Sequence, residues 1–246
     1  MTRRIALWSG PRNVSTALMY SWAQRADTTV EDEPLYGHYL MVSGADHPGR
    51  DDVIADMDCD GPRVAQRLAT APVATPVLFM KHMAHHLVGL DASVVDAFDN
   101  VLLIRDPYDM LPSLTIQMPH ATLADTGLAR QSALFESLTL RGRRPAVIDA
   151  EVLLANPAGV LAALCESLGL AFDAAMLEWP AGPRPEDGIW APHWYHAVHQ
   201  STGFGPYTAK TEFPTHLEPL LEACRPHYNL LRPHVITARD PEPERP

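Results

Sequence analysis

An apolar run that breaks abruptly into turn residues is the strongest constraint on how this chain folds. Residues 5–8 are apolar and predict a buried strand, residues 9–13 end it, and residues 14–26 predict a helix. This order leaves free backbone N–H groups at one spot, next to the positive end of the helix dipole. A cation and two hydroxyls stand there as well, from Arg12, Ser15 and Thr16. The loop therefore predicts a site for a phosphate or a sulfate.

Strand-like and helix-like segments alternate along the rest of the chain. Short apolar runs predict further strands at 77–80, 101–104 and 146–148, and helical patterns lie at 63–70, 84–90, 123–141 and 157–168, with another helix starting at Pro107. Such alternation predicts a three-layer α/β fold with a mostly parallel sheet and helices on both faces. In such a sheet the ligand belongs at the carboxyl ends of the strands.

The length of 246 residues and the apolar share of 46% suit one large domain with a sizeable core. We expect that domain to span residues 1–237 and the charged, proline-rich residues 238–246 to be disordered. Residues 31–39 mix charged, apolar and aromatic side chains and indicate no single element. Residues 46–62 predict a loop with a short helix, and residues 179–207 predict a long ordered loop.

The charge and cysteine content exclude several classes of protein. A formal charge of −11, from 19 basic and 30 acidic residues, argues against nucleic-acid binding, although a local pocket can still be positive. The cysteines Cys59, Cys165 and Cys224 show no CxxC spacing, which predicts neither disulfides nor zinc and fits a reducing cytoplasm. No run approaches the roughly 20 apolar residues that cross a bilayer. We expect a cytoplasmic protein with no membrane partner.

A second segment supplies another candidate anion site. Arg105 follows the apolar run 101–104, and Ser113 comes eight residues later, about two helical turns on. The first loop lacks the lysine of a Walker A motif, and Asp149 is the one carboxylate at a predicted strand end that could hold Mg²⁺. These absences disfavour a kinase or nucleotide hydrolase, which stays as the alternative function.

At this point the chain resembles sulfotransferases that use 3′-phosphoadenosine 5′-phosphosulfate (PAPS). Residues 11–16 are similar to their 5′-phosphosulfate loop, Pro-Lys-Ser-Gly-Thr-Thr, and Arg105-Asp106-Pro107 with Ser113 resembles their 3′-phosphate motif. The resemblance implies a P-loop nucleotide-binding fold, PAPS as donor, no metal, and a hydroxyl or amine of a small molecule or sugar as acceptor. The implied nucleotide-binding residues are Arg12, Asn13, Val14, Ser15, Thr16, Arg105 and Ser113.

This chain departs from the family pattern at three positions. Arg12 replaces the loop lysine, Val14 replaces the loop glycine, and Pro112 biases the preceding residue away from helix just before Ser113. A bulkier residue in place of glycine could keep the backbone farther from a phosphate, and a broken helix would shift Ser113.

Candidates for the acid–base chemistry come from two other segments. Residues 31–38 resemble the Phe-Glu-Pro-Leu-Trp-His segment of carbohydrate sulfotransferases, which implies that Glu33 is the general base. Residues 81–83 resemble the Lys-Thr-His of the cytosolic branch, with Lys81 at the lysine and Met83 at the histidine. Lys81 could neutralise the sulfuryl oxygens, and His82, one residue early, is the alternative base.

A faint resemblance to the family's Gly-Asp-Trp loop implies that Trp190 stacks on adenine or lines the acceptor pocket. Several alternatives stay open on the sequence. Ser15 and Thr16 could only cap a helix, the histidines at 82, 85 and 86 could be core residues, and the protein could be a non-catalytic nucleotide-binding module. A homodimer is left open.

Overall fold

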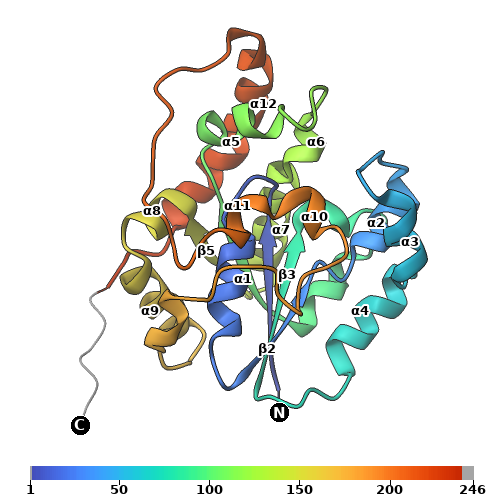
Figure 1. Cartoon of the computed structure of the whole chain (residues 1–246), viewed down its shortest axis with the longest axis vertical. Coiled ribbons are helices and arrows are strands. Elements are labelled where there is room, and N and C mark those ends of the chain that lie inside the picture. The colour runs from blue at the N-terminus through green and yellow to red at the C-terminus, as the bar shows by residue number, and fades with distance from the viewer. Residues whose placement is uncertain (1, 240–246) are drawn as a thin grey trace.

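A single parallel sheet forms the centre of the computed structural model, which describes residues 2–239 (Figure 1). Its five strands lie in the order β2-β3-β1-β4-β5, and each neighbouring pair is parallel. The strands are β1 Arg3–Ser9, β2 Thr28–Asp32, β3 Val77–Met83, β4 Asp99–Ile104 and β5 Ala146–Asp149. Because every neighbouring pair of strands is parallel, the predicted mostly parallel sheet is confirmed. Strand β1 is the central strand, and the loop that follows it lies at the carboxyl edge of the sheet.

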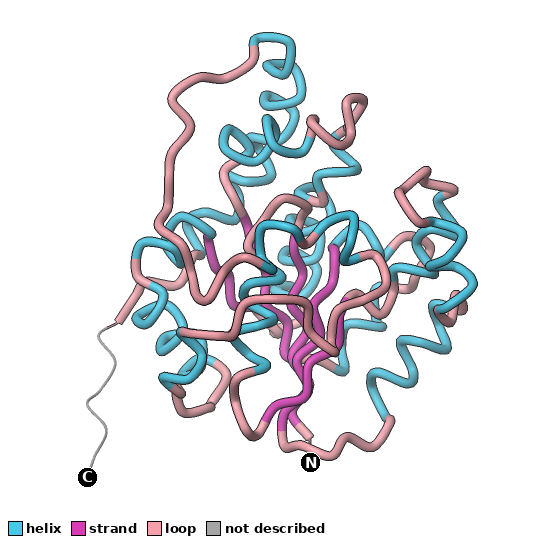
Figure 2. Tube along the Cα trace, in the orientation of Figure 1, coloured by secondary structure: helices cyan, strands magenta, loops and turns pink. Residues whose placement is uncertain are grey.

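Helices cover both faces of the sheet and give three layers (Figure 2). One face packs on α1 Ser15–Ala23, α8 Ala150–Ala155, α9 Pro157–Ser167 and η3 Ala174–Leu177. The other packs on α4 Gly61–Thr70, α5 Pro107–Leu114, α7 Leu128–Leu140 and α12 Glu218–Leu231. Within β1, Ile5 and Leu7 face the first group, while Ala6 and Trp8 face the second, as the two-residue period of a strand requires.

The remaining helices are short and lie around the carboxyl edge or at the surface. They are α2 Tyr36–Ser43, α3 Arg50–Asp56, η1 Ala84–Leu87, η2 Ala92–Ala97, α6 Leu123–Thr126, α10 Ala191–Trp194, α11 His196–His199, η4 Thr215–Leu217 and η5 Arg232–His234. Within residues 2–239, every helix is too short or too polar to cross a bilayer.

The structure adds elements that the sequence patterns did not indicate. Strand β2 is an edge strand whose sequence, Thr-Thr-Val-Glu-Asp, alternates too weakly to be recognised, and its backbone pairs only with β3. The predicted helix 123–141 is divided at Gly127, whose φ of 74° ends α6 and starts α7. The predicted helix 84–90 is the 3₁₀ turn η1, and α12 has no counterpart among the predicted helices.

The tail expected from residue 238 lies almost wholly outside the described residues. Of its two described residues, Arg239 donates its backbone N–H to the carbonyl of Gly159 in α9 over 3.1 Å.

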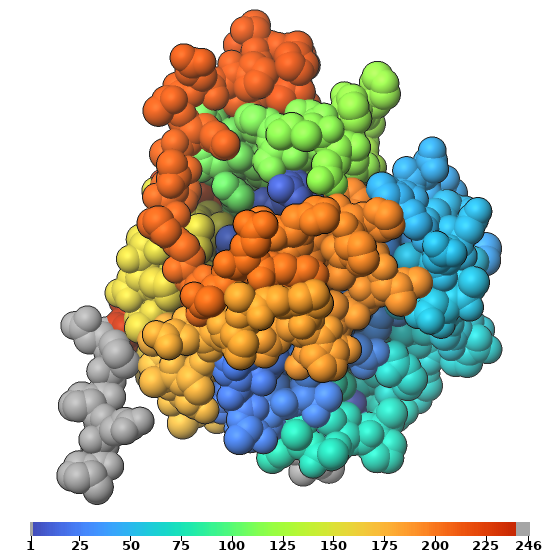
Figure 3. Space-filling model, in the orientation of Figure 1, coloured from blue at the N-terminus to red at the C-terminus, as the bar shows by residue number. Residues whose placement is uncertain are grey.

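Residues 179–207, here called the cover segment, pack over the carboxyl edge of the sheet with α10 and α11. Its orange surface crosses the face of the molecule in Figure 3. Hydrogen bonds join it to the rest of the chain: Tyr20 Oη donates to Asp187 at 2.6 Å, and Tyr195 Oη donates to Asp32 Oδ2 at 2.7 Å. Within the segment, His199 Nε2 lies 2.9 Å from the same Asp187 carboxylate. Polar contacts therefore hold the cover segment in place, in agreement with the long ordered loop predicted for residues 179–207.

Candidate active site

A pocket of about 400 Å³ opens where β1, β2, β3 and β4 end, beneath the cover segment. One end is formed by residues 11–17 with Arg105 and Ser113. The other end is formed by Glu33 and a group of aromatic and histidine side chains. The two motifs that the sequence predicted to bind one nucleotide thus open into the same cavity as the predicted base.

The start of α1 presents backbone amides to this pocket. Its N-terminus carries no side-chain cap, and the first helical hydrogen bond near the loop runs from Leu18 N to Val14 O at 2.9 Å. The amides of Ser15, Thr16 and Ala17 are therefore free of the helix's own hydrogen bonds, and all three residues line the pocket. The alternative that Ser15 or Thr16 only caps the helix is not supported, because neither hydroxyl makes a capping hydrogen bond at α1.

Two residues of the loop fix its shape. Asn13 donates from Nδ2 to the carbonyl of Leu103 over 3.1 Å and accepts from Val14 N over 2.8 Å, so its side chain anchors the loop to β4. Val14 has φ of −89°, which any residue adopts, so the loop needs no glycine here. The glycine that the loop does need is Gly10, because a Cβ there would lie 2.3 Å from the carbonyl oxygen of Thr126.

Arg12 joins the loop to the second motif. Its Nε donates to Ser113 Oγ over 2.9 Å, and its carbonyl accepts from Arg105 Nη1 over 2.8 Å. Pro112 lies inside α5 without ending the helix, so Ser113 keeps the helical position from which it reaches the loop. Residues separated by 93 and 101 positions therefore meet in one pocket.

The two guanidinium groups at this end have no counter-ion. Within the described part of the chain, neither Arg12 nor Arg105 lies within 4.0 Å of a carboxylate, and the buried Nε of Arg105 has no hydrogen-bond partner. Burial lowers the pKa of Arg12, and the neighbouring Arg105 charge lowers it further. Two close cations with unused donors favour an anion between them.

Glu33 stands at the end of β2 with its backbone in the left-handed region, at φ of 41°. Arg12, at φ of 53°, is the other non-glycine residue of the described chain with a positive φ. Such conformations cost roughly 1–3 kcal/mol each and collect at functional sites. Both of these residues line the pocket, one at each end.

Glu33 is 5% exposed, and its carboxyl group belongs to a buried network. Lys81 Nζ donates to Glu33 Oε1 at 2.5 Å, to Asp32 Oδ1 at 2.9 Å and to Tyr195 Oη at 2.5 Å. Burial raises the pKa of Glu33, the Lys81 charge opposes that rise, and the Asp32 charge adds to it. A carboxylate with a raised pKa, facing a pocket, is suited to accept a proton.

The structure does not support the role predicted for Lys81. Its side chain is fully buried, its three donors are taken by the network, and it does not line the pocket. It therefore lies behind Glu33 and fixes that carboxyl group, and it does not reach a sulfuryl group in front of it.

His82 is likewise not brought to the pocket. Successive side chains of a strand point to opposite faces, so His82 lies on the side of the sheet away from Lys81. It stacks on Trp8 with ring centroids 4.3 Å apart, and burial lowers its pKa to about 3. Both ring nitrogens are buried without a partner. Of the two candidate bases, Glu33 is therefore the one that the geometry favours.

Trp190 lines the pocket at the Glu33 end. Its ring packs edge-on against Tyr36 at 5.1 Å, and its Nε1 donates to Tyr195 Oη over 3.1 Å. None of these contacts joins Trp190 to Arg105. They therefore do not support the prediction that Trp190 stacks on the adenine of a nucleotide bound at Arg105. The pocket is also lined by Leu154 of α8 and by residues 203–206 of the cover segment.

Two residues of the network, Asp32 and Tyr195, were not among the predicted site residues. Asp32 was visible only as the neighbour of Glu33, and Tyr195 only as one aromatic among several, because neither lies in a recognised motif. Asp149, the carboxylate considered for Mg²⁺, caps α8 through Glu151 N at 2.8 Å and accepts from Tyr228 Oη at 2.9 Å. It does not line the pocket.

Comparison with known proteins identifies the family of this arrangement. A family model described as Sulfotransferase domain matches residues 3–235. Branched-chain-amino-acid aminotransferase-like proteins 2 and 1 of Arabidopsis thaliana are 41% and 43% identical, over 94% and 93% of this chain. The chain spans only 42% and 41% of the length of these relatives.

Two solved structures share the fold. The sulfotransferase domain of the Synechococcus PCC 7002 olefin synthase matches with a TM-score of 0.52 at 21% identity, covering 90% of this chain and 94% of that domain. A sulfotransferase from Alicyclobacillus acidocaldarius matches with a TM-score of 0.58 at 15% identity, covering 97% and 98%.

Proposed function

The chain belongs to the sulfotransferase family, and from that premise we propose that it transfers a sulfuryl group from PAPS to a hydroxyl or amine of a small-molecule or sugar acceptor. PAPS is the donor substrate, and it leaves as adenosine 3′,5′-bisphosphate. No metal is part of the proposed reaction.

One observation carries the proposal: the joined anion sites of Arg12, Ser113 and Arg105 share a pocket with Glu33. PAPS carries a 3′-phosphate and a 5′-phosphosulfate on one ribose, so its protein site needs two anion cradles a short distance apart. The cradle at the start of α1 suits the phosphosulfate, and the unpaired Nε of Arg105 with Ser113 suits the 3′-phosphate.

The residues then divide the work of an in-line transfer. The acceptor oxygen or nitrogen forms a bond to sulfur while the bond from sulfur to the 5′-phosphate oxygen breaks, and the acceptor proton passes to Glu33. Arg12 and the first-turn amides of α1 stabilise the charge that grows on the leaving phosphate. Lys81 holds Glu33 from behind, and Tyr195 accepts a hydrogen bond from Lys81 and donates one to Asp32, so Lys81 and Tyr195 are positioning residues.

The two alternatives have less support. A kinase or nucleotide hydrolase needs a carboxylate for Mg²⁺ beside the phosphates, and Asp149 is occupied elsewhere. A non-catalytic nucleotide-binding module would have no use for a buried carboxyl group that faces the cavity from a strained backbone position. Glu33 is such a residue.

Calorimetric titration with adenosine 3′,5′-bisphosphate tests the donor site, and no binding at millimolar nucleotide would refute it. A screen of hydroxyl and amine acceptors with labelled PAPS then tests transfer. Nucleotide binding without transfer to any acceptor would favour the non-catalytic module. Mg²⁺-dependent turnover of ATP would favour the kinase or hydrolase.

A further inference from the structure

The end of the pocket beyond Glu33 has an unusual wall, here called the imidazole wall. Three histidines from two separate segments line it, and tyrosine and tryptophan rings pack among them. Its residues are Tyr36, Tyr39, His47, His85, His86, Trp190 and Trp194. His86 stacks on Tyr36 at 5.0 Å and on Tyr39 at 4.7 Å, so the rings hold one another in place.

In the described part of the chain, each histidine of the wall keeps a buried ring nitrogen without a partner: Nε2 of His47, Nδ1 of His85 and Nδ1 of His86. Of their other nitrogens, His47 Nδ1 is hydrogen-bonded to Tyr36 Oη at 2.9 Å, whereas His86 Nε2 lies 4.0 Å from Glu33 Oε2, beyond hydrogen-bond distance. Buried polar atoms are normally hydrogen-bonded, so three such atoms around one cavity point to a polar ligand.

The charges at this end exclude some ligands. Burial lowers the pKa of all three histidines, that of His85 to about 4, so the rings are neutral. The nearest lysine, Lys81, is behind Glu33 and outside the pocket, while Glu33 and Asp125 are both in the lining. At this end an anionic acceptor would meet carboxylates and no cation. An ammonium group would be kept protonated by pairing with Glu33, and without a lone pair it cannot attack sulfur.

A metal is not the expected occupant. No group of three or more histidine, cysteine, aspartate or glutamate side chains in the described chain is arranged to hold one. A neutral imidazole offers one donor and one acceptor, and which nitrogen donates depends on the tautomer. A hydroxyl both donates and accepts, so it can satisfy either form, and flat aromatic faces complement a ring.

We propose that the imidazole wall is the acceptor subsite, and that the acceptor is an uncharged ring with at least two hydroxyl groups. One hydroxyl loses its proton to Glu33, and another is held by the unpartnered imidazole nitrogens. This inference rests on the proposed function for the identity of the reacting hydroxyl, but binding of the ring does not require transfer.

Binding of matched probes to the full chain tests the subsite. Titrations use resorcinol and methyl β-glucoside as neutral probes from an aromatic and a saturated source, 3-hydroxybenzoate as the anion, and tyramine as the cation. Each is titrated with and without saturating adenosine 3′,5′-bisphosphate. We expect one neutral probe to bind at least about tenfold more tightly than both charged probes. Whether that probe is resorcinol or methyl β-glucoside tells whether the acceptor ring is aromatic or saturated.

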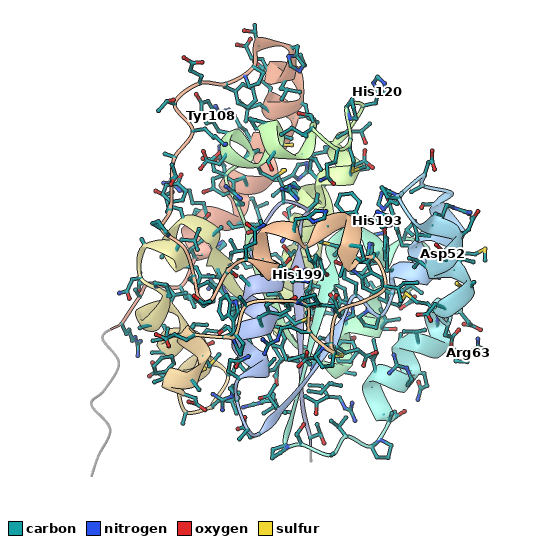
Figure 4. The ribbon with its side chains drawn as sticks, in the orientation of Figure 1. Asp52, Arg63, Tyr108, His120, His193 and His199 are labelled. Carbon is teal, nitrogen blue, oxygen red and sulfur yellow. The ribbon has the colours of Figure 1, made fainter. Side chains whose placement is uncertain are left out.

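Variants then assign the contact to the wall. His47→Phe and His85→Phe keep a ring and remove the nitrogens, and each should weaken the neutral probe by about tenfold, the cost of roughly one hydrogen bond. His193→Gln is the matched control, because His193 is exposed on the neighbouring α10 and does not line the pocket (Figure 4). All three should bind the bisphosphate like the unmodified chain, which also reports that they fold.

Tighter binding of a charged probe, unchanged neutral binding in both phenylalanine variants, or tight binding of Zn²⁺ that those variants abolish would overturn the subsite. Failure of the donor proposal looks different. There the bisphosphate does not bind, while the neutral probe still binds in its absence and still depends on His47 and His85.

Discussion

Removal of the Arg105 guanidinium should abolish the protein's preference for a nucleotide with a 3′-phosphate. Arg105 Nη1 is held by the carbonyl of Arg12 at 2.8 Å, while among residues 2–239 its buried Nε has no partner and no carboxylate neutralises its charge. The group therefore has a donor and a full charge available for a phosphate. A hydrogen bond to a charged group contributes about 1.5–3 kcal/mol, which corresponds to roughly 10- to 150-fold in Kd.

The assay compares two nucleotides in one calorimeter. Adenosine 3′,5′-bisphosphate and AMP differ only in the 3′-phosphate, so the ratio of their Kd values isolates that group. The unmodified chain should prefer the bisphosphate, and Arg105→Ala should lose roughly 10- to 150-fold for the bisphosphate and little for AMP. Arg105→Lys should fall between them, because it keeps the charge but not the planar fork.

A surface arginine provides the control. Arg63 lies on α4, pairs with Asp58 at 2.6 Å and is well exposed (Figure 4), so Arg63→Ala should leave both affinities unchanged. An equal loss for AMP and bisphosphate in Arg105→Ala would mean that Arg105 acts by holding the loop at Arg12. An unchanged bisphosphate affinity would refute the reasoning altogether.

Three further outcomes follow. Glu33→Gln should abolish transfer without changing nucleotide affinity. Because the pKa of Glu33 is raised, kcat/KM of the unmodified chain should rise with pH through that pKa as the carboxylate forms. A flat pH profile would count against Glu33 as the base. Gly10→Ala should lower stability by roughly 1–3 kcal/mol, because its Cβ meets the backbone of Thr126, whereas Gly205→Ala enters open space; thermal melts compare them. Tyr195→Phe removes a buried hydroxyl shared by the network, so it should cost roughly 1–3 kcal/mol in denaturant unfolding and shift the pH profile of transfer. If stability and pH profile both stayed unchanged, that result would contradict the positioning role of Tyr195.

Much of the sheet was readable from the sequence because its central strands are buried on both faces. Residues 5–8, 77–80 and 101–104 are continuous apolar runs, as parallel strands between two helical layers must be. Strand β2 was not readable, since it lies at the edge and its side chains are mostly polar. Its hydrogen bonds come from β3, forty-nine residues away at Thr28 and Val77, and no local pattern encodes that pairing.

The sequence by itself indicated the family and the two predicted anion sites, because a phosphate-binding loop is local: a strand, a turn and a helix start supply its amides whatever surrounds them. The roles of Lys81, His82 and Trp190 were decided only by tertiary structure. Their motifs fixed their types but not the direction of their side chains, which depends on strand parity and on contacts with Asp32, Trp8 and Tyr36. The network that buries Glu33 likewise needs β2, β3 and the cover segment together, since Asp32 accepts a hydrogen bond from Tyr195, 163 positions away. Burial and pairing of that kind are properties of the packed chain, and so is the raised pKa on which the proposed chemistry depends.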